Sequence, residues 1–256
     1  MSEAKTTKIN KKVILIGILV VILVVAVVIV YTSVIAPAMK KNNFIKEYGQ
    51  ELYDTMGLVS KGEYIKFGSY EQDNDTANGK ETIEWLVLEV KDGKALVISK
   101  NILECMPFYN EKEFTDWGTC TLRTWLNEEF YNEAFSDAEK AMVPTVTVVA
   151  ERSPYPSNTA NPGENTEDKV FILNVQEAES YLSSNKARKS LCTEYTKAKG
   201  NFVDDNGYGW WWLRTNGRDK KLATYVYEHG KVAYLGNWVN ATETGVRPVI
   251  WIDLNA

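Results

Sequence analysis

The stretch IEWLVLEVKDGKALVISK, at residues 83–100, decides the fold that we expect for the larger part of this chain. Two apolar runs flank Lys91-Asp92-Gly93-Lys94, and the Asp-Gly pair favours a type I′ turn, which joins antiparallel strands. Because both runs are almost continuously apolar, other elements should cover both faces of this hairpin. We therefore place it in the centre of a sheet.

The middle of the chain changes from strand spacing to helix spacing. Apolar residues recur at helical intervals over residues 121–135, and Ser136 and Glu139 then have the spacing of a capping box that opens a second helix. A strand-like run at 169–173 precedes Asn174-Val175-Gln176-Glu177, which indicates a further helix. Gly200 is placed to end another helix over 193–199, because glycine adopts the left-handed conformation at little cost.

The end of the chain returns to strand patterns, at residues 210–214, 223–227, 232–235 and 246–252. Turns are predicted between them at Asn216-Gly217, His229-Gly230 and Gly236-Asn237. Strands, then helices, then strands indicate an antiparallel α+β domain rather than repeated βαβ units. The polar loop at residues 151–168 is long enough to be either functional or disordered, and the sequence leaves both alternatives open.

A second feature stands before this domain. Residues 13–30 are eighteen consecutive Val, Ile, Leu, Ala or Gly residues, and no charge follows them until Lys40. A helix over residues 13–35 would be about 34 Å long, enough to cross a hydrocarbon core of about 30 Å. A cleaved signal peptide is the competing interpretation, but its apolar region is shorter, at about 7–15 residues. We predict an uncleaved transmembrane helix, followed by a stalk helix within residues 36–59.

The lysines on either side of the apolar run predict its orientation. Lys5, Lys8, Lys11 and Lys12 precede the run, whereas only Lys40 and Lys41 follow it closely. The excess of positive charge favours a cytoplasmic location for residues 1–12. The domain at residues 60–256 is then expected on the outer side of the plasma membrane, with the membrane itself as a partner.

Charge and cysteine content exclude several functions. From residue 42 onward the chain carries 23 basic and 33 acidic residues, which disfavours nucleic-acid binding because phosphate contacts need clustered Lys and Arg. Cys105, Cys120 and Cys192 lack Cys-x-x-Cys spacing, and His229 is the single histidine, so we expect no zinc site and no cofactor. A disulfide between Cys105 and Cys120 and burial as free thiols remain alternatives.

Three consecutive tryptophans, Trp210-Trp211-Trp212, form the least ordinary string in the domain. On a strand they point alternately to its two faces, so at least one indole pair should lie in the core. Core packing is favoured for them, and an exposed indole that stacks on a planar ligand is the alternative.

Several motifs, taken in order, carry a family resemblance that covers about residues 60–254. They are Ile65-Lys66-Phe67-Gly68-x-Tyr70, Leu122-Arg123-x-Trp125-Leu126-Asn127, Asp168-Lys169-Val170-Phe171-Ile172-Leu173 and Gly245-Val246-Arg247-Pro248-Val249-Ile250-Trp251-Ile252. The chain resembles an uncharacterised bacterial family classed as a domain of unknown function. That family is similar in its closing strands to the C-type-lectin-like fold, which includes the formylglycine-generating, sulfatase-modifying enzymes.

The resemblance implies an architecture rather than an activity. Formylglycine-generating enzymes hold copper with cysteine thiolates, one of them directly after the arginine of the closing motif, where this chain has Pro248. Lectin-like calcium triplets do not occur here either. Asp73-Asn74-Asp75 resembles a calcium loop, but Ala77 takes a ligand position and Asn78 the required glycine position, so we predict a polar turn and no metal site.

These observations favour binding over catalysis. We expect a membrane-anchored extracytoplasmic module that recognises a cell-envelope glycan, peptide or protein. Loop ends beside aromatic residues supply its predicted ligand contacts: Trp211, Arg214, Asn216, Asn237 and Trp238. The alternatives are a formylglycine-generating type of enzyme and a structural subunit of an envelope complex. Arg247 is expected to be buried and structural.

Overall fold

The predicted central hairpin is present in the computed structural model, which describes residues 22, 24–36, 38–39 and 59–255. Strand β2 (Glu81–Lys91) pairs antiparallel with β3 (Lys94–Ser99), and Asp92 and Gly93 between them both have positive φ, at 50° and 71°. Two positive φ values define the predicted type I′ turn. The hairpin lies inside a five-stranded sheet in the order β1-β2-β3-β12-β7.

The other strands of this first sheet come from distant parts of the chain. Strand β1 (Tyr64–Tyr70) pairs with β2, while β12 (Val249–Asp253) lies between β3 and β7 (Val170–Phe171). All pairs in the sheet are antiparallel, as expected. Residues 246–252, predicted as one strand, are instead divided between two sheets. Pro248 has no N–H to donate to a ladder, so the strand ends at Arg247-Pro248 and resumes at Val249.

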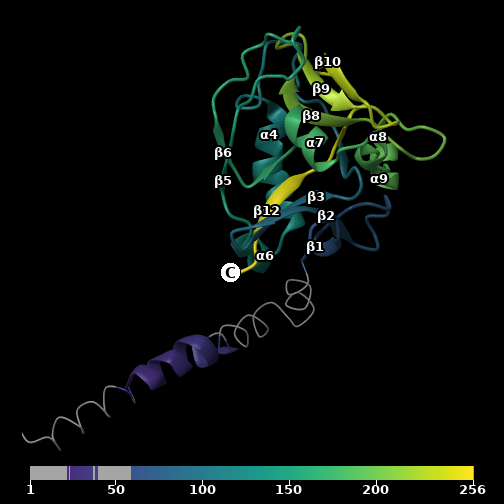
Figure 1. The fold of residues 1–256 in the computed structure, drawn as a ribbon. Coiled ribbons are helices and arrows are strands. Elements are labelled where there is room, and N and C mark those ends of the chain that lie inside the picture. Colours follow the sequence, from purple (N-terminus) through teal and green to yellow (C-terminus); the bar gives the residue numbers. More distant parts are fainter. Residues whose placement is uncertain (1–21, 23, 37, 40–58, 256) are drawn as a thin grey trace, which may run out of the picture. The chain divides into compact units, whose positions relative to one another are not determined.

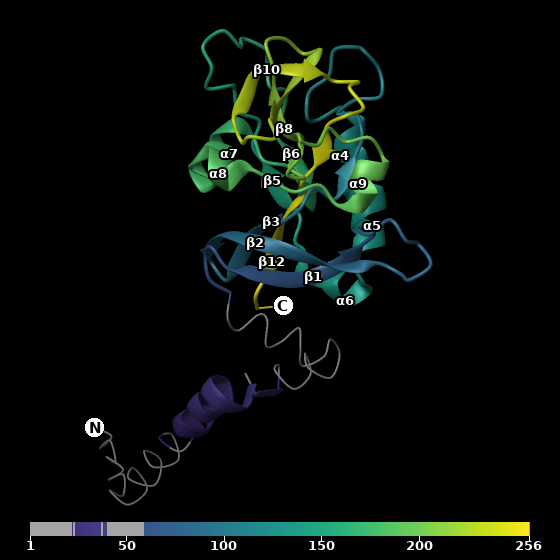
Figure 2. The same ribbon diagram turned by 90° about the vertical axis from the view of Figure 1, so that its right-hand side faces the viewer.

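A second five-stranded sheet has the order β10-β9-β8-β11-β4. Its members are β4 (Glu104–Cys105), β8 (Trp211–Asn216), β9 (Leu222–Val226), β10 (Val232–Trp238) and β11 (Gly245–Val246). In Figure 2, β8 and β10 lie toward the end of this domain opposite β1, β2 and α6 (Asp137–Met142).

Two of the three predicted turns in this second sheet are different in the structure. The His229-Gly230 turn joins β9 to β10 as expected, with Gly230 at φ +85°. Gly236-Asn237 is not a turn, because both residues lie inside β10. Gly236, at φ +83°, sits where the register with β9 shifts, so the glycine marks a bulge. Asn216 ends β8, and residues 217–221 form a longer connection to β9.

The helices are short and lie mainly in the middle of the chain. The predicted helix over 121–135 is continuous but contains a π-helical stretch: α4 (Thr121–Trp125), η2 (Leu126–Phe130) and α5 (Tyr131–Ala134). Capping boxes at Ser136–Glu139 and Asn174–Glu177 open α6 and α7 (Val175–Tyr181). The remaining helices within residues 59–255 are α8 (Asn185–Arg188) and α9 (Glu194–Ala198), and Gly200, at φ +94°, follows α9.

The long polar loop is anchored to the domain at several points. It leaves β5 (Val146–Val148) and returns as β6 (Thr166–Asp168), and these strands form a two-stranded sheet (Figure 1). The Gln176 side-chain amide of α7 donates to the Arg152 carbonyl at 2.6 Å, and Asn158 donates to the Tyr234 carbonyl of β10. The loop therefore has fixed contacts with both a helix and a strand.

The N-terminal residues form a unit of their own, which ends at Asp54. Residues 22 and 24–30 are helical, and a π-helix, η1 (Tyr31–Ile35), continues them. Within the described parts of the chain, no helix has the length and apolar character needed to cross a membrane. The predicted tail at 1–12, most of the first half of the predicted span, and the stalk residues 40–58 lie outside the described residues.

Candidate functional site

Strand β8 places its tryptophans in the core. Trp211 and Trp212 both have an exposed fraction of 0%, and every residue of the strand is buried. Their indole N–H groups donate to the carbonyls of Arg188 and Met106, at 3.0 and 2.9 Å. Trp211 was a predicted ligand contact, but its indole has no surface through which it could meet a ligand from solvent. Core packing, the favoured interpretation of the tryptophan string, holds for both residues.

Arg214 fixes the start of a helix. Only 6% exposed, it forms a two-pronged contact with Glu177 and donates to the Ile172 carbonyl at 2.7 Å. The same Glu177 carboxylate accepts the Asn174 N–H at 2.9 Å in the capping box of α7. A bidentate guanidinium–carboxylate pair has a defined geometry. Arg214 therefore joins β8 to α7 instead of presenting a charge to solvent.

Asn216 and Asn237 differ in position. Asn216 is 5% exposed, and its side-chain amide donates to the Thr115 carbonyl at 3.0 Å, which attaches the end of β8 to the loop at residues 106–120. Asn237 is half-buried beside Trp238, and its amide donates to the Glu243 carboxylate at 3.0 Å. Of the two, only Asn237 has surface that a ligand can reach.

Trp238, at the end of β10, is the one predicted contact with a large exposed side chain, at 45%. The Lys112 ammonium lies 3.9 Å from its ring centroid, and Lys221 lies 4.9 Å from the ring of Phe114, which is 67% exposed. We call Lys112, Phe114, Lys221 and Trp238 the Trp238 surface. An ammonium over an indole face is attractive and restrains the ring.

Backbone hydrogen bonds connect the segments that carry the Trp238 surface. Val239 donates to the Lys221 carbonyl at 3.0 Å, Thr115 donates to the Lys220 carbonyl at 3.0 Å, and Tyr109 donates to the Val239 carbonyl at 2.8 Å. Lys112, Phe114 and Lys221 were not among the predicted contacts. Phe114 offered a usable signal, because it is the single aromatic residue among four charged residues at 111–116.

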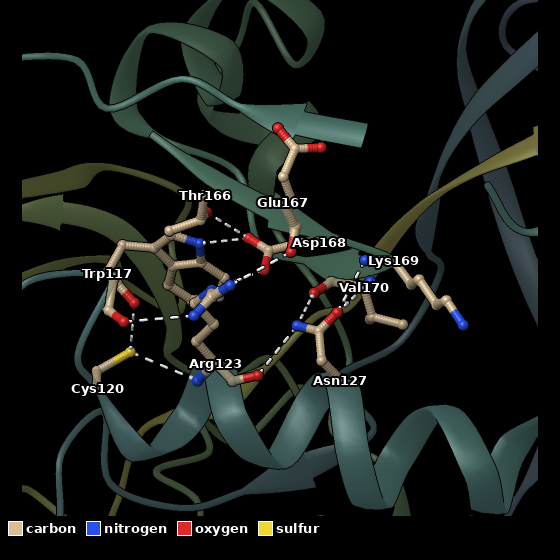
Figure 3. Close-up of polar contacts among 10 residues, drawn as sticks. Trp117, Cys120, Arg123, Asn127, Thr166, Glu167, Asp168, Lys169 and Val170 are labelled. Carbon is tan, nitrogen blue, oxygen red and sulfur yellow. Dashed lines mark hydrogen bonds and ion pairs between the residues drawn. The ribbon is translucent and has the colours of Figure 1, made fainter. Parts of the chain in front are cut away.

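Two of the family motifs meet at a buried carboxylate, Asp168, which is 1% exposed (Figure 3). Its Oδ1 accepts from Arg123 Nε at 2.6 Å, and its Oδ2 accepts from Trp117 Nε1 at 2.9 Å and from the Thr166 hydroxyl at 2.6 Å. Both oxygens are thus partnered. This arrangement is that of a scaffold, in which α4 is attached to β6.

Asn127 continues the same attachment one helical turn later. Its side-chain oxygen accepts the N–H groups of Lys169 and Val170, at 2.8 and 3.2 Å, and its amide donates to the Val170 carbonyl at 2.8 Å (Figure 3). The motifs at 122–127 and 168–173, far apart in the sequence, are therefore two sides of one contact.

Arg247 is buried, as expected, with an exposed fraction of 3%. Its Nε and Nη2 donate to the Ser99 carbonyl at 3.1 and 2.8 Å, and its guanidinium lies 4.8 Å from the Trp211 ring centroid. No carboxylate among the described residues pairs with it. Burial lowers its pKa to about 9, which reflects the cost of removing the charge from water.

The three cysteines are free and buried. Of the two alternatives, the structure has free thiols and no disulfide between Cys105 and Cys120. Burial raises the pKa of each of these two thiols to about 12, and it also raises the pKa of Cys192. All three are therefore protonated at neutral pH, a form that is a poor nucleophile. His229 lies in the exposed turn and contacts Glu228 at 2.8 Å.

A family model described as a domain of unknown function (DUF6273) matches residues 92–254, well over half of the chain. Neither a curated protein nor a solved structure matches.

Proposed function

We propose that this chain, which belongs to the DUF6273 family of domains of unknown function, is a membrane-anchored binding module. Residues 13–35 are the proposed anchor, residues 1–12 the cytoplasmic tail, and the C-terminal domain lies outside the plasma membrane. The domain, with the C-type-lectin-like architecture that we propose for it, recognises a cell-envelope glycan, peptide or protein.

The observation that carries this proposal is the exposed indole of Trp238. The predicted contacts on β8 are buried in the interior, whereas Trp238, at the end of β10, is 45% exposed. Trp238 is the last residue of strand β10 in the second sheet, and the Lys112 ammonium over its ring restrains the indole. Exposed aromatic rings on a rigid scaffold can stack on sugar rings or on the side chains of a peptide. Lys112 adds positive charge for a ligand with carboxylates, whereas Lys221 lies 3.6 Å from the Glu113 carboxylate.

Binding is also the function that the cysteines favour. An enzyme of the formylglycine-generating type needs reactive thiolates, and burial keeps the thiols of Cys105 and Cys120 protonated by raising their pKa to about 12. No observation favours that enzymatic alternative over binding.

The substitution Trp238→Ala tests the proposed surface. The full-length chain, purified in detergent and immobilised, is incubated with a glycan array and with extract of the host's cell envelope. We expect the variant to lose binding while its Tm stays within a few degrees of wild type, because an exposed ring contributes little to the core. Tyr64→Ala is the matched control, since Tyr64 is 54% exposed, has Lys100 over its ring, and lies outside the surface. If Trp238→Ala binds as wild type does, the Trp238 surface is not the binding site. If the variant unfolds, Trp238 belongs to the core.

The proposed topology has a separate test. Intact cells that express the chain are treated with protease. We expect loss of the domain after Lys41 and protection of a tag at Ser2, because lysines concentrate before the apolar run. A protected domain with a cleaved tag would reverse the orientation, and secretion of a shortened chain would indicate a signal peptide.

A further inference from the structure

Three carboxylates meet where β1 passes into β2, on the side of the first sheet near α5 (Figure 2). One oxygen of each of Glu71, Asp73 and Glu81 lies within 4.8 Å of the others. The pairing of Tyr70 with Glu81 at the ends of the two strands brings Glu71 and Glu81 together. This group is therefore built by strand register as well as by the loop at residues 72–80.

Glu71 distinguishes this group from an ordinary acidic surface. Its exposed fraction is only 7%, and its Oε1 has no hydrogen-bond partner. The Glu71 carboxylate points into the group, since it supplies one of the three neighbouring oxygens. A buried polar atom without a partner is costly and uncommon in native proteins. A ligand with positive charge would remove that cost.

No protein cation fills this role. Within residues 59–255, none of the three carboxylates forms an ion pair with a lysine, arginine or histidine. The adjacent Lys80 turns to Glu133, where its Nζ lies 3.1 Å from the carboxylate and donates to the main-chain carbonyl at 3.0 Å. Three carboxylates this close repel one another when they are ionised, unless something compensates their charge.

Hydrogen bonds orient the other two carboxylates without neutralising them. Glu81 Oε2 accepts the N–H groups of Gln72 and Asp73, at 2.7 and 3.2 Å. Asp73 accepts from the Asn78 amide at 2.8 Å and from the Asp75 N–H at 2.8 Å. A carboxylate has about four acceptor positions, so both groups keep free positions for a cation.

We propose that Glu71, Asp73 and Glu81 bind a calcium ion. All three ligands are carboxylate oxygens, which suit Ca²⁺ or Mg²⁺ and not the softer metals that prefer thiolate or imidazole. Calcium accepts irregular coordination by six to eight oxygens and can complete it with loop carbonyls and water, whereas Mg²⁺ demands near-ideal octahedral geometry. With only three carboxylate ligands, we expect a Kd of about 10⁻⁴–10⁻³ M, the range of extracellular calcium modules.

A bound ion would join the two ends of the β1–β2 loop. The same loop contacts α9, because the Tyr195 N–H donates to the Gln72 carbonyl at 3.0 Å. Calcium would therefore stabilise the loop together with its contact to α9. The sequence register of a calcium loop does not reveal this group, because Glu71 and Glu81 belong to the ends of two strands.

Direct binding of the metal tests the proposal. Ca²⁺ alone is titrated into metal-free, full-length chain by calorimetry, and Tb³⁺ luminescence excited through nearby tyrosines gives a second signal. We expect one saturable site in the wild type and at least a tenfold weaker affinity in Glu71→Gln and in Asp73→Asn, since each variant removes a charged ligand. Mg²⁺ at the same concentration should displace little Tb³⁺.

Glu63→Gln is the matched control. Glu63 is exposed and precedes β1, so the full length of that seven-residue strand separates it from Glu71, and its variant should bind Ca²⁺ as wild type does. Asp73 is exposed, so Asp73→Asn keeps the test valid even if Glu71→Gln does not fold. The proposal is overturned if the wild type shows no saturable binding up to about 10 mM Ca²⁺, well above the expected Kd, or if both variants bind as tightly as wild type. Neither result bears on Trp238.

Discussion

Asp168 and Glu71 are both buried carboxylates, yet the charged groups around them have opposite signs. Asp168 is 1% exposed and accepts hydrogen bonds from Arg123, Trp117 and Thr166, so that both of its carboxylate oxygens have partners. Glu71 is 7% exposed, has an oxygen without a partner, and has two other carboxylates as near neighbours. Burial alone thus fails to separate a scaffold residue from a ligand. The charges and donors that face the carboxylate make the distinction.

The largest effect is expected from Asp168→Ala. The substitution leaves a guanidinium, an indole N–H and a hydroxyl without their shared acceptor, and breaking a buried pair costs about 3–5 kcal/mol. Arg123 keeps a side-chain exposure of 26%, so we expect the lower end of that range, about 3 kcal/mol, or a fall in Tm of about 6–12 °C. Thermal unfolding of the full-length chain measures it.

Glu84→Ala is the control for Asp168→Ala. Glu84 pairs with Lys100 at 2.6 Å, but both side chains are 42% exposed, and such pairs contribute about 0–1 kcal/mol. Equal falls in Tm for the two variants would mean that the Asp168 network is no more important than a surface pair.

A smaller effect of opposite sign is expected from Glu71→Gln in the presence of a calcium chelator. Neutralising Glu71 removes repulsion within the acidic group, so the metal-free stability should stay the same or rise by up to about 1 kcal/mol. The same variant should lose the stabilisation that added Ca²⁺ gives the wild type, about 1.4 kcal/mol at ten times the Kd. A clear loss of metal-free stability would assign Glu71 to the scaffold, alongside Asp168.

Local chemistry made much of the fold predictable. Asp92-Gly93 specified its turn because few other pairs adopt two positive φ values, and Ser136–Glu139 specified a helix start because both partners are close in sequence. Gly236 was predicted to be in a turn but lies at a bulge, since a glycine at positive φ serves a bulge as well as a turn. The break at Pro248 separates two sheets, and which sheet each half joins depends on distant strands.

The candidate site was less predictable, for the same reason. Arg214 and Asn216 are polar residues near a strand end, a pattern shared by ligand contacts and interior anchors. Their partners, Glu177 and the Thr115 carbonyl, come from distant segments of the chain. These hydrogen bonds hold the two side chains in the interior. Glu71 and Glu81 come together only through the register of β1 on β2. Trp238 stays the proposed contact because nothing from a distant segment covers its indole fully.

The position of β12 also determines when the first sheet can be completed during protein synthesis. This strand fills the place between β3 and β7, yet residue 249 is synthesised long after residue 99. At about 5–20 residues per second, the ribosome needs roughly 8–30 s to supply the intervening segment. During that interval the nascent chain carries the unpaired edge of β3, and after residue 171 also that of β7, and an unpaired strand edge can pair with the wrong chain. Whatever accompanies the growing polypeptide has to shield those edges until the strand that closes the sheet arrives.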